Sequence, residues 1–332
     1  MELSVFFVGT AGSVPSARRG LPALLVRFGG ERILIDCGEG TQRQLTRSVG
    51  LADLTDIFIT HLHADHWLGL PGMLKSFDLR DRDRPLNVYG PPGLAGLMDV
   101  MRRHVYGRLG YELTIAELEP GQAIRRDTLQ IHPFAVRHRG LAYGYALVED
   151  ARPGRFDAEL AARLGLTPGP DFGRLQRGET IGGVRPEQVI GETREGRKVV
   201  VSGDTGPSET LALAAHEADL LVHEATFGED ERDRARQTGH STAQQAAGVA
   251  RDAGVRLLAL THLSSRYGGG ELRDEARAVF PATVVPRDFD LVEIPFPERG
   301  APALVRPPDA FAPPWTPSPE AGSAPRPART PS

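Results

Sequence analysis

The sequence has 332 residues, of which 40% are hydrophobic and 25% are charged, with a formal net charge of -4 and a pI near 6.2. The apolar content suffices for a full core, whereas the small negative charge excludes a global basic field for nucleic-acid binding. Cys37 is the only cysteine, which excludes an internal disulfide and favours a reducing compartment. No apolar stretch approaches the ~20 residues of a membrane span, and no secretory signal is recognisable. We therefore expect a cytoplasmic protein with no membrane association.

The hydrophobic pattern predicts strands that alternate with helices along the chain. The predicted strands span residues 4–8, 23–28, 32–36, 56–60, 86–89, 128–136, 141–148, 197–202, 219–222 and 256–261. The predicted helices span residues 41–49, 68–79, 93–104, 208–216, 242–253 and 271–280. Gly29 and Gly30 indicate a hairpin turn, and Ser241 or Thr242 is a natural N-cap. Hairpins followed by strand–helix units indicate an α/β fold with mixed sheets covered by helices.

Two segments depart from this alternation. Residues 149–197 are weakly periodic and rich in Gly, Pro and Arg, and so long a stretch without regular structure is usually functional or disordered. From residue 297 onwards, the chain holds eleven of its 27 prolines, with alanine and serine between them. Because such a composition cannot bury a core, we expect residues 297–332 to form a disordered tail after one domain that spans residues 1–296.

Four metal-ligating side chains follow the strand predicted at 56–60. His61, His63, Asp65 and His66 lie within six residues, and imidazole and carboxylate ligands suit zinc, manganese or iron. No cysteine is present among them, which excludes a cysteine-type structural zinc site. On a loop between a strand and a helix, alternate side chains face one point while the next two turn toward another. The motif therefore favours two adjacent metal ions over one.

Three more candidate ligands stand at strand ends. His138 follows the strand at 128–136, and Asp204 and His262 end two later strands. Strand ends that converge on one edge are where α/β sheets place their sites. Each of these residues alone is more often structural. Together with the first four, and with an aspartate able to bridge two ions, they form a strong candidate for a dinuclear site.

Seven short segments carry a resemblance to a known family. They are GTAGSVP (9–15), DCGEGTQ (36–42), THLHADHWLGL (60–70), SGDT (202–205), HEAT (223–226), GHST (239–242) and THLSSRY (261–267). The ligand order is similar to that of the metallo-β-lactamase superfamily, whose fold is an αββα sandwich of two mixed sheets flanked by helices. More closely, the chain resembles the ribonuclease Z family of tRNA 3′-processing endonucleases, through residues 4–285. The HEAT, GHST and SSRY segments are more specific than the metal motif, which the whole superfamily shares.

The resemblance implies two Zn²⁺ ions per subunit, with Mn²⁺ as an alternative. The ligands it implies are His61, His63 and His138 for one ion, Asp65, His66 and His262 for the other, and Asp204 as a bridge. Two such ions lower the pKa of a bound water and stabilise the oxygens of a phosphoryl displacement. The implied reaction cuts precursor tRNA on the 3′ side of the discriminator nucleotide. It leaves a 3′-hydroxyl on the tRNA and a 5′-phosphate on the trailer.

The resemblance also implies catalytic groups beside the ligands. Asp65 can accept the proton of the attacking water, and His240, oriented by Glu224, is the candidate general acid for the leaving 3′-oxygen. The structural alternative for His240 is a neighbour of a helix cap. His223 is expected to orient groups around the ligands. The histidines outside any motif are expected to be structural: His104, His132 and His216.

In this family an arm protrudes from the domain and grips the elbow of the tRNA, and we expect it here at about residues 150–196. Residues 167–178 resemble its Gly-Pro segment. Residues 149–197 hold eight arginines but nine acids, so phosphate contacts would depend on local presentation. An ordinary mobile insertion is the alternative. The family acts as a homodimer, in which the arm of one subunit reaches the substrate at the other subunit's site.

Five residues are candidates for substrate binding. Gly169 and Pro170 match the Gly-Pro segment of the arm, and Arg174 and Arg177 are the arginines next to it. Arg266, in the SSRY segment, could hold a phosphate, although a surface salt bridge is the alternative reading.

Two other functions share part of this pattern. A small-molecule phosphodiesterase or arylsulfatase of the same superfamily would use the same ligands but would not need a long arm. A non-catalytic RNA-binding scaffold would need neither the ligands nor His240, and their presence argues against it. The sequence therefore predicts a precursor-tRNA endonuclease, with a small-ester hydrolase as the alternative.

Overall fold

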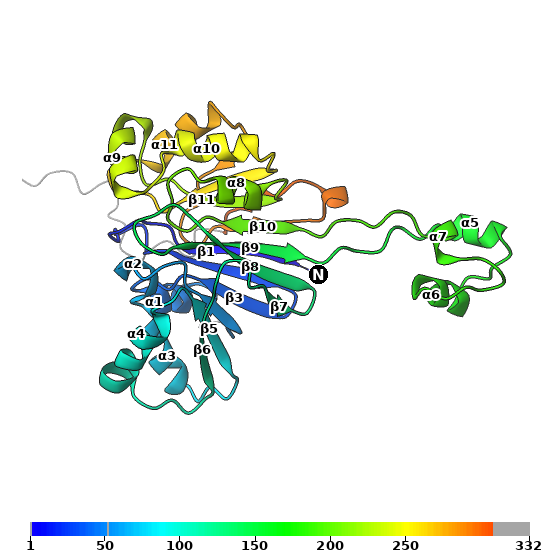
Figure 1. Cartoon of the computed structure of the whole chain (residues 1–332), viewed down its shortest axis with the longest axis horizontal. Coiled ribbons are helices and arrows are strands. Elements are labelled where there is room, and N and C mark those ends of the chain that lie inside the picture. Colours follow the sequence, from blue (N-terminus) through cyan, green and yellow to red (C-terminus); the bar gives the residue numbers. More distant parts are fainter. Residues whose placement is uncertain (1, 52, 308–332) are drawn as a thin grey trace, which may run out of the picture.

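The computed structural model describes residues 2–51 and 53–307 and contains two facing β-sheets (Figure 1). The first sheet has the strand order β15-β14-β1-β2-β3-β4-β5-β6, and the second has the order β13-β12-β11-β10-β9-β8-β7. The strands of the first sheet are β1 (Leu3–Gly9), β2 (Ala23–Phe28), β3 (Glu31–Ile35), β4 (Asp56–Phe58), β5 (Leu86–Gly90), β6 (Leu113–Glu117), β14 (Leu291–Glu293) and β15 (Ala303–Val305). Those of the second are β7 (Ile124–Arg126), β8 (Leu129–Ala135), β9 (Tyr143–Glu149), β10 (Lys198–Val201), β11 (Leu220–Glu224), β12 (Leu257–Thr261) and β13 (Thr283–Val284).

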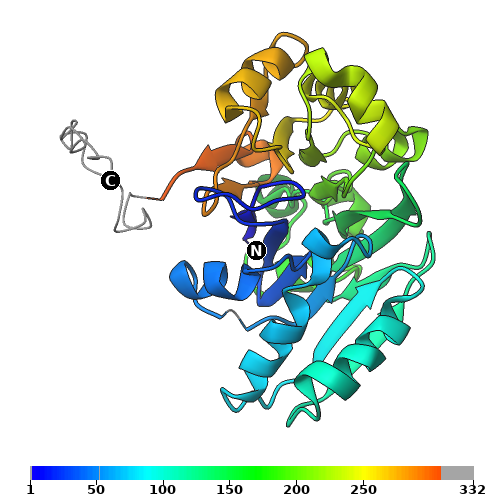
Figure 2. The same cartoon turned by 90° about the vertical axis from the view of Figure 1, so that its left-hand side faces the viewer.

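Helices cover the outer side of each sheet, as Figures 1 and 2 show. The first sheet carries α1 (Thr41–Arg47), α2 (Ala64–Trp67), α3 (Leu70–Asp78), α4 (Leu94–Met101) and the π-helix η1 (Arg102–Tyr106). The second carries α8 (Glu209–Ala215), η2 (Glu229–Glu231), α9 (Arg232–Thr238), α10 (Ala243–Asp252) and α11 (Gly269–Arg277). Both sheets combine parallel and antiparallel pairs. The αββα sandwich expected from the sequence is confirmed.

The central strands are apolar on both faces because both faces are covered. In β1, Val5 and Phe7 pack between the two sheets, whereas Phe6 and Val8 pack toward the helices of the first sheet. This two-residue alternation gives one core between the sheets and a separate core under each helical layer. The sandwich thereby holds the strand ends, which carry the candidate ligands, in fixed positions.

An arm leaves the sandwich between β9 and β10 and ends in three short helices (Figure 1, right). These are α5 (Ala158–Arg163), α6 (Pro170–Gln176) and α7 (Pro186–Val189). They enclose a small apolar cluster of their own: Ala161, Leu166, Leu175, Val184 and Val189. The segment that looked irregular in the sequence therefore contains a small folded module on a two-stranded stalk.

Most predicted elements are present with small shifts at their ends. The strand predicted at 23–28 matches β2, the Gly29–Gly30 turn joins β2 to β3, and Thr242 caps α10 by accepting a hydrogen bond from the Gln245 backbone. The sequence missed the helices α2, α5, α6, α7 and α9, the edge strands β6, β7, β13 and β15, and the short strand β14 beside β15. Among the residues that the structure describes, no helix is both long and apolar enough to cross a bilayer.

The predicted start of the C-terminal tail at residue 297 is wrong. Residues Pro297–Arg299 form the 3₁₀ helix η3, and β15 then pairs with β14, so that Leu291 lies opposite Val305. Three residues suffice for an edge strand when the neighbouring strand supplies the hydrogen bonds. Prolines outside the three paired residues do not prevent this pairing. The folded part therefore extends at least to Val305. The remainder of the predicted tail, 308–332, lies outside the described residues.

Candidate metal centre

The loop after β4 and the helix α2 that follows it present the four residues of the histidine motif. His63 has an extended backbone and caps α2, while Asp65 and His66 already belong to the helix. The change from extended to helical backbone sends the side chains in two directions. His61 and His66 are buried, each 1% exposed, while His63 lies at the surface.

The second sheet supplies three further ligand candidates from loops that follow its strands. His138 follows β8, Asp204 follows β10, and His262 follows β12 directly, with a left-handed backbone (φ 57°). Gly203 precedes Asp204 at φ 61°, and a Cβ there would lie 2.7 Å from the Tyr143 carbonyl oxygen. Parallel strands β10, β11 and β12 end at the same edge, which places these residues opposite the histidine loop of the first sheet.

The seven predicted ligands come together in two clusters that share one carboxylate. The ligand atoms of each cluster lie within 4.8 Å of one another. The clusters are His61, His63 and His138 on one side, and Asp65, His66 and His262 on the other. Asp204 lies between them, with its Oδ2 atom 3.8 Å from Nε2 of His61, 3.4 Å from Nε2 of His66 and 3.3 Å from Nε2 of His262.

Hydrogen bonds from the surrounding protein orient the histidine rings. His66 donates Nδ1–H to Asp36 (2.7 Å), and His138 donates Nδ1–H to the Gly239 carbonyl oxygen (2.8 Å). His262 Nδ1 lies 2.8 Å from the Thr226 hydroxyl, whose own proton goes to a carboxylate, so this ring is also the donor. Nε2 of each ring therefore faces the centre, which is how partners outside the ligand set usually orient metal-bound imidazoles.

The donor atoms fit a metal cation. His63 Nδ1 lies 2.9 Å from His61 Nε2 and 3.1 Å from His138 Nε2, and one proton on His63 cannot serve both neighbours. His66 Nε2 and Asp204 Oδ1 are buried without a hydrogen-bond partner among the described residues. A cation bound among these nitrogen and oxygen atoms satisfies all of them, and the donor set suits Zn²⁺. The chain can therefore hold a metal cofactor at this edge.

The electrostatics of the two buried histidines also agree with a cation bound at this site. Burial and the neighbouring His66 hold the pKa of His61 well below its usual range, so His61 is neutral, as a ligand must be. For His66, burial alone would lower the pKa, but Asp204 and Asp36 raise it well above the usual range. The carboxylates thus favour positive charge at this point of the centre.

A histidine–glutamate pair lies beside the clusters. His240 Nδ1 donates to Glu224 Oε1 (2.8 Å), and its ring stacks on His262 with the centroids 5.4 Å apart. Buried Glu224 also accepts hydrogen bonds from the Thr205 and Thr226 backbone amides. Burial alone would lower the pKa of His240, but the Glu224 carboxylate and Asp204 raise it to about 9. His240 can therefore carry a proton at neutral pH.

The loop after β1, which contains the GTAGSVP segment, covers one side of the centre, although the sequence assigned it no role there. The Ser13 amide donates to Asp65 Oδ2 (2.9 Å), and a Cβ on Gly12 would lie 2.5 Å from His262 Nδ1. Asp288 holds both ends of this loop, because it accepts hydrogen bonds from the Thr10 hydroxyl (2.7 Å) and the Gly20 amide (2.6 Å). The resemblance of the GTAGSVP segment to the family was the signal that the sequence offered.

The arginines and glycine–proline pair predicted to bind substrate are not part of the centre. Arg266 pairs with Glu231 through two contacts of 2.9 and 3.1 Å, and Arg174 and Arg177 share Glu179 in the arm. Gly169 and Pro170 start α6 in the arm, where Gly169 takes φ 136° and proline fits the first helical turn. The remaining histidines, His104, His132, His216 and His223, belong to none of the clusters found among the described residues. Buried His223 donates to the carbonyl oxygen of Glu224, which agrees with a supporting role.

Two arginines that the sequence reasoning missed flank His138. Arg137 and Arg139 are exposed, and neither forms an ion pair with a carboxylate among the residues described. The Arg137 backbone is anchored by Thr205 and Gly206, and the Arg139 guanidinium contacts the Gln237 carbonyl oxygen. In the sequence, the sign that Arg137 and Arg139 could matter was that both are adjacent to the candidate ligand His138.

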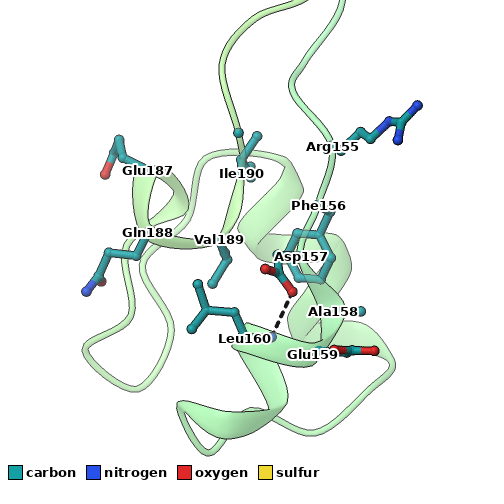
Figure 3. Close-up of a pocket in the computed structure, with 11 residues that line it drawn as sticks. Arg155, Phe156, Asp157, Ala158, Glu159, Leu160, Glu187, Gln188, Val189 and Ile190 are labelled. Carbon is teal, nitrogen blue, oxygen red and sulfur yellow. Dashed lines mark hydrogen bonds between the residues drawn. The ribbon is translucent and has the colours of Figure 1, made fainter. Parts of the chain in front are cut away.

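A groove also lies on the arm, between α5 and α7 (Figure 3). Phe156, Leu160 and Val189 form its apolar part, and Asp157 caps α5 by accepting a hydrogen bond from the Leu160 amide (2.8 Å). Basic and acidic side chains both line it, including Arg155. The groove is therefore no concentrated positive surface, in keeping with the balanced charge of the arm.

Comparisons with known proteins agree with this geometry. The model of the metallo-beta-lactamase superfamily matches residues 20–262. Ribonuclease Z of Haloferax volcanii is 46% identical over 305 residues, covering 89% of this chain and 96% of that protein, and ribonuclease Z of Gemmatimonas aurantiaca is 45% identical over 308 residues, covering 90% and 98%. The crystal structure of the short form of human tRNase Z superposes with a TM-score of 0.66 at 28% identity, covering 88% of this chain and 99% of that one.

Proposed function

The chain belongs to the ribonuclease Z family of the metallo-β-lactamase superfamily, and from this premise we propose that it is the endonuclease that removes 3′ trailers from precursor tRNA. The observation that carries this proposal is the complete ligand set at one edge of the sandwich, with the His240–Glu224 pair beside it. The cut lies on the 3′ side of the discriminator nucleotide. It leaves a 3′-hydroxyl on the tRNA and a 5′-phosphate on the trailer, in the cytoplasm where tRNA is matured.

We propose two Zn²⁺ ions per subunit, which Mn²⁺ can replace. One would be held by His61, His63 and His138 and the other by Asp65, His66 and His262, and Asp204 would be available to both. When bound, divalent ions of this kind lower the pKa of water and stabilise the charge on the entering and leaving oxygens of a phosphoryl transfer. The Nδ1 hydrogen bonds described above keep the ligand atoms of His66, His138 and His262 directed at the centre.

The protein's own side chains manage the protons of the reaction. A water molecule attacks phosphorus, the bond from phosphorus to the ribose 3′-oxygen breaks, and that oxygen needs a proton. Asp65, which lies 3.4 Å from His262 Nε2 at the mouth of the centre, accepts a proton from the water. Glu224 fixes Nδ1–H of His240, so the opposite nitrogen of the protonated ring is free to donate to the leaving oxygen.

The position of the arm supports a homodimer. Asp204 follows the end of β10, whereas the arm joins the start of β10 and the end of β9. The seven residues of β9, at ~3.4 Å each, separate these two points by roughly 20 Å. The arm then extends away from the sandwich, on the side opposite α2 and α9 (Figure 1). We therefore propose that it serves the centre of a second copy of the chain.

We propose that Arg137 and Arg139 bind phosphates of the substrate next to the centre. The arginines predicted from the sequence are already paired with carboxylates, as Arg266 is with Glu231. Binding a phosphate through Arg266 requires breaking that pair, whereas Arg137 and Arg139 have no carboxylate partner within the part of the chain that the structure describes. Exposed arginines free of such pairs can release counterions and strengthen RNA binding.

The decisive experiment incubates the purified full-length chain with a precursor tRNA that lacks an encoded CCA. We expect a single cut after the discriminator nucleotide, loss of cleavage in EDTA, and recovery on adding Zn²⁺ or Mn²⁺. Mapping the product ends checks for the 3′-hydroxyl and 5′-phosphate. A metal-loaded chain that hydrolyses bis(p-nitrophenyl) phosphate but leaves the precursor intact would indicate the small-ester hydrolase instead.

A further inference from the structure

We propose that the segment Ile294–Glu298 acts as a clamp that fixes the direction of the arm, with Glu298 as a positioning residue for cleavage of arm-dependent RNA substrates. The proposal rests on the function proposed above. This segment follows β14, far from the arm in sequence, and runs against the base of the arm's stalk. We call Ile294, Phe296 and Glu298, with their contacts to the stalk, the arm clamp.

The Glu298 carboxylate holds both strands of the stalk together. Arg152 lies on the outgoing strand and Arg194 on the returning strand, and their backbones exchange two hydrogen bonds of 2.7 and 2.8 Å. Glu298 Oε1 accepts from Arg152 Nη1 (3.0 Å) and Arg194 Nη1 (2.9 Å). One carboxylate from the C-terminal segment thus bridges two arginines more than 40 residues apart, and these charge-assisted bonds are stronger than neutral ones.

An aromatic side chain completes the clamp. The Phe296 ring lies between two guanidinium groups. Its centroid is 3.5 Å from the Cζ atom of Arg152 and 4.0 Å from the Cζ atom of Arg197. Arg197 is buried, pairs with Glu149 at the end of β9 (2.7 Å), and donates to the Ile294 carbonyl oxygen (2.9 Å). Phe296 therefore joins the stalk to an ion pair that belongs to the sandwich, through cation–π contacts that are stronger when partly buried.

Beyond the clamp, the arm has little other support from the sandwich. Its apolar cluster, which includes Leu175 and Val189, contains no residue of the sandwich among those described. The stalk next to the clamp is narrow, because a Cβ on Gly154 would lie 1.8 Å from the Gly191 carbonyl oxygen. The direction of the arm is therefore set at its base, and an arm held in its binding direction loses less freedom when it binds RNA.

The test compares Glu298→Gln with Glu293→Gln, a control on an exposed acid at the end of β14, just before the clamp segment, that has no ion pair among the described residues. Both are assayed on precursor tRNA and on bis(p-nitrophenyl) phosphate. We expect Glu298→Gln to raise KM for precursor tRNA about five- to tenfold, with kcat and the small-substrate rate unchanged, and Glu293→Gln to match wild type. An unchanged KM for precursor tRNA overturns the proposal. So does an equal loss on both substrates, which is what a general structural role gives.

A second variant shows whether Glu298 acts through the arm. Leu175→Ala removes a fully buried side chain from the arm's cluster and leaves the sandwich intact. Once the arm is unfolded, its direction no longer matters, so we expect the double variant to be no worse on precursor tRNA than Leu175→Ala alone. Additive losses overturn the clamp. If wild type itself cuts the small phosphodiester but no precursor tRNA, the proposed function fails first and the clamp with it.

Discussion

The metal centre and the arm lie at opposite ends of the same two strands, β9 and β10, and they are built in opposite ways. The centre is partly buried, draws side chains from both sheets, and is surrounded by hydrogen bonds that orient its rings, such as that from His66 to Asp36. The arm has a small apolar cluster of its own and exposed ion pairs. The fold therefore separates the metal centre from the arm that we propose captures the RNA, and we expect that each can be disrupted without the other.

The largest effect is expected from Asp204→Asn, which should abolish activity on both substrates. Asp204 Oδ2 faces three ligand histidines, so loss of its charge removes the shared ligand of the proposed centre. We expect no measurable cleavage of precursor tRNA or bis(p-nitrophenyl) phosphate, together with reduced metal content by atomic emission, since loss of a residue that merely orients a metal ligand already costs about 10–100-fold. Asp252→Asn, on an exposed acid, is the control. Full metal content with full activity would contradict the shared-ligand role.

His240→Ala should damage catalysis while leaving the metal in place. A general acid typically contributes about 10²–10⁴-fold, so we expect kcat for precursor tRNA to fall by about this factor with metal content unchanged. A p-nitrophenolate leaving group needs no proton, so the loss on bis(p-nitrophenyl) phosphate should be much smaller. Equal losses on the two substrates would argue against proton donation. His132→Ala, outside the clusters, serves as the control.

Leu175→Ala should separate the two regions most clearly. Leu175 is fully buried in the arm, and removing such a side chain costs about 2–5 kcal/mol, which a module of this size cannot spare. We expect precursor-tRNA cleavage to fall at least tenfold and small-phosphodiester hydrolysis to stay unchanged. Hydrogen exchange should be faster in the arm alone. Val305→Ala, at an exposed position in an edge strand of the sandwich, controls for truncation of an apolar side chain outside the arm. A loss on the small substrate would show that the two regions are not independent.

Replacing Arg137 and Arg139 by glutamine should weaken RNA binding modestly. We expect KM for precursor tRNA to rise about fivefold, and the slope of log KM against log salt to become shallower by ~1–2, since up to two phosphate contacts are lost. Arg251→Gln, at an exposed arginine paired with Asp252, controls for general charge. An unchanged salt slope would place the phosphate contacts elsewhere.

The smallest effect on catalysis is expected from Asp288→Asn, which tests how the loop over the centre is held. Burial raises the pKa of Asp288 to about 6, so the folded state binds this proton more tightly than the unfolded state. Protonated Asp288 therefore adds on the order of 3 kcal/mol to the free energy of unfolding. This contribution is complete below about pH 4 and is lost as the pH rises through about 6. Asparagine cannot titrate, so urea unfolding of wild type and variant should diverge over this range. Parallel curves would contradict the assignment.

Much of the fold could be predicted because its strands carry strong signals. A strand buried on both faces, such as β1, is a continuous apolar run, and the histidine motif marks the end of β4. Edge strands such as β6 were missed because they are short, half exposed and depend on a neighbour for their hydrogen bonds. The helices α5, α6 and α7 were missed because four to seven residues give too few turns for a clear period.

Residues whose roles depend on contacts between distant parts of the chain could not be predicted. The ligand candidates stood at strand ends, where the direction of the chain already suggested convergence. Asp36, which orients His66, lies 30 residues away from it, and the Arg266–Glu231 pair spans 35 residues, so neither partner is visible until the chain is folded. The same holds for Glu298, whose contacts to the arm cross more than 100 residues.

The arm is attached at the end of the sheet remote from the metal centre, and in the dimer proposed above activity on precursor tRNA becomes a joint property of two chains. A subunit with an Asp204→Asn centre still carries an intact arm, and a Leu175→Ala subunit still carries an intact centre. Mixed after denaturation and renaturation, these two preparations, each impaired in precursor-tRNA cleavage, should complement each other, because each mixed pair contains one whole arm facing one whole centre. In a chain whose arm served its own centre, no mixture would regain activity.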